Sequence, residues 1–96
     1  MSSRFNMGIA LIKIKIMPTS PSENLKKIEE HLEKTLKEKG ARGISFEEEP
    51  IAFGLKAIIA SFNIIESEEL EPIEEALGKI HGVQSVQVID MRRAIG

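Results

Sequence analysis

The chain has 96 residues, no cysteine and a formal net charge of -2, with 13 basic and 15 acidic side chains. This length supports one hydrophobic core and excludes two. The missing cysteines exclude disulfides, thiolate metal sites and cysteine nucleophiles, and the nearly balanced charge argues against a general attraction to nucleic acid or anionic membranes.

The start of the chain differs from the rest. Residues 1–6 have no periodicity, so we expect a disordered leader there and a single domain over residues 7–96. No apolar run approaches the roughly 20 residues of a membrane helix, and no signal peptide is evident, so we expect a cytoplasmic protein. His31 and His81 have no neighbours at metal-ligand spacing, and we expect neither a metal nor a cofactor.

The first two elements follow from periodicity. Residues 9–17 alternate between apolar and mixed positions, which predicts a strand with one covered face. Ser20 is the predicted N-cap of a helix, with Glu23 completing a capping box. Gly40 is predicted to end this helix. Its buried stripe comprises Leu25, Ile28, Leu32 and Leu36.

Three further strands and one helix are predicted. Residues 41–49 and 55–65 read as strands, the second being central because both of its faces carry apolar residues. Pro72 restricts the second helix to a start near Leu70 or Glu71, and this helix runs to about Ile80. Residues 83–91 form the last strand, and Arg92 and Arg93 are expected at a free terminus.

The element order is therefore strand, helix, strand, strand, helix, strand. Right-handed crossovers place both helices on one face of a four-stranded antiparallel sheet, which is the α+β, ferredoxin-like βαββαβ arrangement. Burial of the two helix stripes consumes most periodic apolar positions. Little apolar surface remains to line an internal ligand cavity.

The run from Pro50 to Lys56 is the most unusual segment. Gly54 lies between bulky apolar residues, where it packs no side chain and favours a bulge or a close backbone approach. Phe53 and Lys56 nearby supply an apolar ring and a cation. These groups are better suited to binding a partner than to catalysing a reaction. From the residues alone, Phe53 could equally well be an aromatic residue of the core. Lys56 could equally well be a surface lysine whose aliphatic stem lies along apolar surface.

Two motifs carry a resemblance to a known family. The segments PIAFGLKAI and EEALGKIHGVQSVQVIDMRR, in this order, resemble archaeal translation elongation factor 1-beta, and the resemblance extends from about Met7 to Arg93. It implies a guanine-nucleotide exchange factor with no chemistry of its own, and therefore no enzyme. Such a factor promotes GDP release and GTP loading on elongation factor 1-alpha, the GTPase that delivers aminoacyl-tRNA.

The resemblance also implies roles for individual residues. Phe53 corresponds to a partner-facing aromatic, Gly54 to a site of close backbone approach and Lys56 to a basic contact. Eukaryotic members place a functional lysine near the C-terminus, but no lysine follows the aspartate of the last strand here. Arg92 or Arg93 is the candidate substitute.

Other functions of this fold fit less well. A ferredoxin-like regulatory module that binds a small ligand is the main alternative, but it favours a glycine-rich first loop, and residues 17–21 contain no glycine. An acylphosphatase-like hydrolase needs an arginine in that loop, and residues 6–40 contain none. An RNA-binding domain would carry aromatics on the first strand, which has none.

Overall fold

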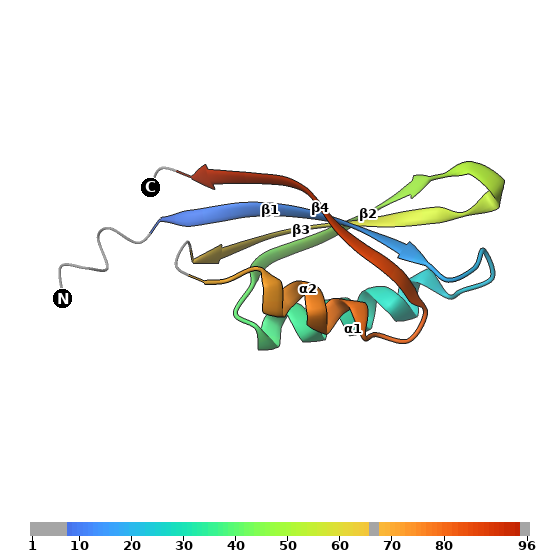
Figure 1. The fold of residues 1–96 in the computed structure, drawn as a ribbon, viewed down its shortest axis with the longest axis horizontal. Helices are drawn as coiled ribbons and strands as arrows, with labels where there is room; N and C mark the ends of the chain where they lie inside the picture. Colours follow the sequence, from blue (N-terminus) through green and yellow to red (C-terminus); the bar gives the residue numbers. More distant parts are fainter. Residues whose placement is uncertain (1–7, 66–67, 95–96) are drawn as a thin grey trace.

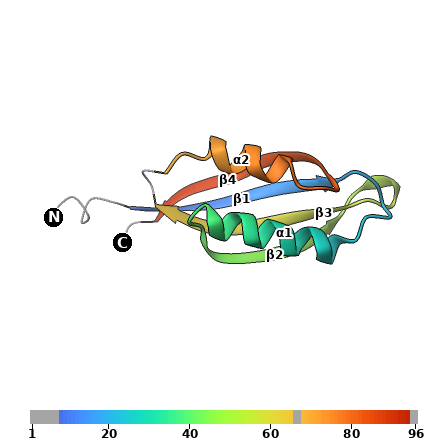
Figure 2. The ribbon, with the colours of Figure 1, turned by 90° about the horizontal axis from the view of Figure 1, so that it is seen from below.

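The computed structural model describes residues 8–65 and 68–94, so the leader expected over residues 1–6 lies outside the described part. The strands form one antiparallel sheet in the order β2-β3-β1-β4, and both helices cover the same face of it (Figures 1 and 2). The predicted ferredoxin-like βαββαβ class is confirmed. The elements are β1 Ile9–Pro18, α1 Leu25–Glu38, β2 Arg42–Pro50, a 3₁₀ turn Ala52–Gly54, β3 Lys56–Ile65, α2 Glu71–Gly78 and β4 Val83–Ala94.

The core lies between the helices and the covered face of the sheet. Alternate residues of the central strands point toward the helices, as the period of two requires. The helix stripes predicted from the sequence meet them, and each fully buried Ile or Leu contributes about 1.5–3 kcal/mol. The buried cluster comprises Ala10, Ile12, Ile14, Ile16, Ile28, Leu32, Leu36, Ala41, Ile58, Ala60, Phe62, Ile64, Ile73 and Leu77.

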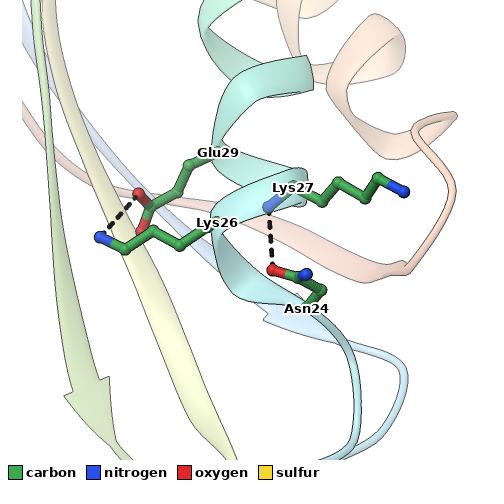
Figure 3. A network of polar contacts seen from close by, with 4 residues as sticks. All are labelled: Asn24, Lys26, Lys27 and Glu29. Carbon is green, nitrogen blue, oxygen red and sulfur yellow. Dashed lines mark hydrogen bonds and ion pairs between the residues drawn. The ribbon is translucent and has the colours of Figure 1, made fainter.

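Helix α1 begins later than predicted, and the assignment of Ser20 as its N-cap was wrong. The N-cap is Asn24, whose Oδ1 accepts a hydrogen bond of 3.2 Å from the backbone N–H of Lys27 (Figure 3). The Glu23 carboxylate accepts a 2.8 Å hydrogen bond from the Thr19 hydroxyl, so it caps no helix. The preceding residues form a turn that the capping signal alone did not distinguish from a helical turn.

The other end of α1 follows the prediction. The backbone N–H of Gly40 donates to the carbonyl of Lys37 at 3.0 Å, and that of Ala41 donates to Leu36 at 2.9 Å. This pair of bonds is the Schellman arrangement, which satisfies carbonyls at the helix end. Ala41 is buried there and leads the chain directly into β2.

Strand β4 is longer than predicted. It continues through Arg92 and Arg93 to Ala94, because the first half of β1 supplies backbone partners for this extension. Arg92 lies opposite Leu11 and Arg93 opposite Ala10. The expectation that the two arginines form a free terminus was therefore wrong.

Candidate functional site

The β2–β3 hairpin closes through a short and well-defined loop. Pro50 and Lys56 are the last paired residues of the two strands. Beyond them, the N–H of Ile51 donates to the Leu55 carbonyl at 2.7 Å, and the N–H of Leu55 donates to Ala52 at 3.3 Å. The predicted motif therefore occupies the tip of the hairpin, which projects at one end of the sheet (Figure 1).

Phe53 lies at this tip and is 93% exposed. Its backbone is left-handed, with φ 64° and ψ 32°, and it is the one non-glycine residue with positive φ in the described chain. A left-handed conformation costs an L-residue about 1–2 kcal/mol. The interpretation of Phe53 as a core aromatic is excluded, because the ring is exposed. It therefore contributes no packing energy to the isolated domain that would offset the strain of its backbone.

Gly54 and Lys56, the other two candidates near the ring, differ in the property that makes them notable. Gly54 is also left-handed, with φ 76°, and a Cβ built there meets no heavy atom within 4 Å. The glycine thus serves the backbone conformation and leaves open space beside Phe53. Lys56 is exposed at the start of β3, and its ammonium group has no carboxylate partner among the described residues.

The two candidate arginines lie at the opposite end of the sheet. Register with β1 places Arg92 on the open face, and its Nε lies 3.1 Å from Oδ2 of Asp90 on the same face. Arg93 lies on the helix-covered face, where it lines a cavity of about 480 Å³ together with Leu70 and Met91. The two arginine side chains therefore project from opposite faces of the sheet.

The hairpin tip and the arginines are therefore not brought together. Arg92 pairs with Leu11, whereas the register of β3 places Lys56 level with Pro18 at the other end of β1. Strand residues advance about 3.4 Å each, so these seven positions separate the ends by about 24 Å. A partner that contacts both must span most of the length of the sheet.

One surface feature was not predicted from the sequence. Lys13 lines a cleft on the open face of the sheet together with Ser61 and Asn63. The available signal was that these polar residues occupy the central strands β1 and β3. Recognition of the cleft from this signal requires the strand register, which places Lys13 opposite Ser61.

Among the residues that the structure describes, no three His, Cys, Asp or Glu side chains are placed to hold a metal ion. None of the helices in the same part of the chain is long and apolar enough to span a membrane. The features that stand out in the described chain are instead suited to contact with a partner: an exposed ring, cationic side chains and polar side chains on an open sheet.

Known proteins resemble this chain over nearly its whole length. Residues 11–94 match the family model of the EF-1 guanine nucleotide exchange domain. Elongation factor 1-beta of Methanocaldococcus jannaschii is 41% identical over 92 residues, which cover 92% of this chain and 100% of that protein. The elongation factor 1-beta proteins of Methanosarcina acetivorans and Methanosarcina barkeri are each 43% identical over 89 residues, 91% of this chain and 99% of theirs.

Proposed function

This chain belongs to the EF-1 guanine nucleotide exchange domain family, and we propose that the GTPase it acts on is elongation factor 1-alpha. The family activity is nucleotide exchange, so the protein is an exchange factor and not an enzyme. The proposed partner delivers aminoacyl-tRNA during translation elongation, and on this ground a cytoplasmic location is part of the proposal. The match to this family leaves the regulatory-module alternative without support.

The hairpin tip is proposed to anchor the GTPase. The observation that carries this proposal is the 93% exposure of Phe53 in a strained left-handed conformation. Aromatic side chains are frequent hot spots of interfaces, where they fill pockets on the partner. Gly54 leaves room for the partner backbone beside the ring, and Lys56 supplies a cation with no partner of its own in the described chain.

The arginine end is proposed to act on the charged part of the nucleotide site. GDP phosphates and their magnesium ion are held by electrostatic contacts, which an arriving guanidinium group can disturb. Arg92 and Arg93 take the place of the C-terminal lysine of eukaryotic relatives in this proposal. Because they lie on opposite faces of the sheet, separate substitutions are needed to assign the role.

Exchange of this kind needs no covalent step. A factor that binds the nucleotide-free GTPase best must weaken nucleotide binding, and by reciprocity the nucleotide weakens binding of the factor. A hundredfold acceleration of GDP release corresponds to a release barrier that is about 2.7 kcal/mol lower. One aromatic side chain that becomes buried in the interface and a few charged contacts supply energies of this size.

The test is release of a fluorescent GDP analogue from the cognate elongation factor 1-alpha, followed by stopped flow with excess unlabelled GTP. The unmodified protein should accelerate release, and Phe53→Ala or Lys56→Ala should reduce the acceleration at limiting factor. Both side chains are exposed, so the unfolding transitions of the variants should remain close to that of the parent. No acceleration by the unmodified protein with a verified partner would refute the proposal.

A further inference from the structure

The open face of the sheet carries a polar cleft of about 290 Å³ at the arginine end. Helices cover the other face, so this surface is uncovered by the elements of the domain (Figure 1). Strand register places Lys13 opposite Ser61 on one side and Asp90 on the other, while Leu11 lies between Asn63 and Arg92. Residues directly opposite in antiparallel strands have Cβ atoms about 4.5–5.5 Å apart, so these side chains form one surface.

The cleft offers more hydrogen-bond donors than its own acceptors use. The side chains of Lys13, Ser61 and Asn63 have no hydrogen-bond or ion-pair partner among residues 8–65 and 68–94. Arg92 uses Nε toward Asp90 at 3.1 Å, and a guanidinium group has further N–H donors. Two cations and one carboxylate leave a net positive charge, so the site is suited to an anion.

A glycine keeps one side of the cleft open. Gly43 has φ 62° in an irregular part of β2, where the pairing with β3 shifts register. A Cβ at this position would lie 2.8 Å from Nδ2 of Asn63. The missing side chain therefore leaves the Asn63 amide space beside β2, and Asn63 remains half-buried with its amide unengaged by the described residues.

We propose that this cleft binds a carboxylate side chain of the GTPase, an inference that rests on the proposed function. The open face has two electrostatic ends: Glu47 and Glu49 lie toward the hairpin, with Lys15 4.0 Å from Glu49, and the cleft lies toward the arginines. A partner that spans both ends is oriented by this polarity, because complementary charge fixes register and suppresses the reversed arrangement. Arg92 then belongs to the anchoring surface, which leaves Arg93 for the nucleotide site.

The test measures affinity for nucleotide-free elongation factor 1-alpha, where no nucleotide phosphate competes for the cleft. Lys13→Glu should weaken binding roughly tenfold, and the neutral Lys13→Met about threefold. The Lys13→Glu loss should shrink as salt is raised from low to high concentration. Asn63→Asp, which replaces a donor by a second carboxylate, should weaken binding in the same direction.

Lys27→Glu is the matched control, because it makes the same charge change on an exposed α1 side chain of the helix-covered side (Figure 3). If Lys13→Glu and Asn63→Asp bind as the control does, the cleft is no docking site. If they lose affinity only when GDP or GTP is present, the anion is a nucleotide phosphate, and the proposal is also overturned. Normal acceleration by the unmodified protein in either case leaves the exchange function standing, whereas no acceleration overturns both.

Discussion

The two ends of the sheet position the residues that we propose face the partner by different means. At the hairpin end, a loop closed by its own backbone hydrogen bonds fixes Phe53 and Gly54 within one short continuous segment. At the other end, Arg92 and Arg93 are positioned by pairing between β1 and β4, which lie far apart in the sequence. The proposed hairpin contact therefore depends on local turn chemistry, and the proposed arginine contact depends on the register of the whole sheet.

The largest effect that separates the two ends is expected from Phe53→Ala. If the hairpin is the anchor, this variant should need about a hundredfold more protein for half-maximal GDP release, since truncation of a hot-spot aromatic costs about 2–4 kcal/mol. The maximal rate at saturation should change little. Ile89→Ala truncates a side chain that is 46% exposed on β4 and serves as the control. A lowered maximal rate with unchanged half-saturation would reverse the roles of the two ends.

Arg93→Glu should show the opposite pattern. If this residue disturbs the phosphate site, charge reversal should lower the maximal release rate about tenfold while half-saturation changes less, because the hairpin still anchors the partner. Lys79→Glu makes the same charge change at an exposed position after α2 and should behave as the parent. Equal rates for the two variants would remove Arg93 from the mechanism.

The glycines at the two ends should differ in stability when replaced by alanine. Gly43→Ala adds a Cβ that would lie 2.8 Å from the Asn63 side chain, in addition to requiring positive φ. We expect a loss of about 2 kcal/mol in unfolding free energy. Gly54→Ala meets open space and should lose about 1 kcal/mol from the backbone conformation alone. Urea unfolding of both variants measures the difference, and equal losses would contradict it.

The smallest expected effect is an increase in the free energy of unfolding. Phe53→Gly removes an exposed ring from a left-handed position, so it should raise the unfolding free energy by about 0.5–1 kcal/mol. Phe46→Gly offers the contrast, because Phe46 packs against the core from β2 and its loss should destabilise the domain. Urea unfolding distinguishes the two, and a destabilised Phe53→Gly would show that the ring supports the fold.

The sequence allowed the elements that depend on periodicity to be predicted. Alternation along residues 9–17 and the stripe of Ile28, Leu32 and Leu36 identified the strand, the helix and the faces they bury. Asn24 was missed as the N-cap because Ser20 gave an equally good local signal. The choice between them depends on tertiary contacts of the loop, such as the 2.9 Å bond from the Thr19 N–H to the Gly82 carbonyl.

The candidate site was predictable to different degrees at the two ends. The motif around Gly54 indicated a special backbone conformation, although the left-handed geometry of Phe53 could not be read from residue types. Arg92 and Arg93 were misplaced because polar residues at a strand end carry no alternation signal of their own. Their strand conformation comes from the backbone partners in β1, and the cleft around Lys13 likewise exists only through register.

If Phe53 serves the partner and not the fold, its removal should impair exchange without destabilising the domain. GDP release from elongation factor 1-alpha should be measured with the parent and with Phe53→Gly, after unfolding experiments establish that the variant is at least as stable. We predict that the variant loses most of the acceleration at concentrations where the parent is fully active. Acceleration equal to that of the parent, over the same concentration range, would show that the Phe53 ring is not needed for exchange.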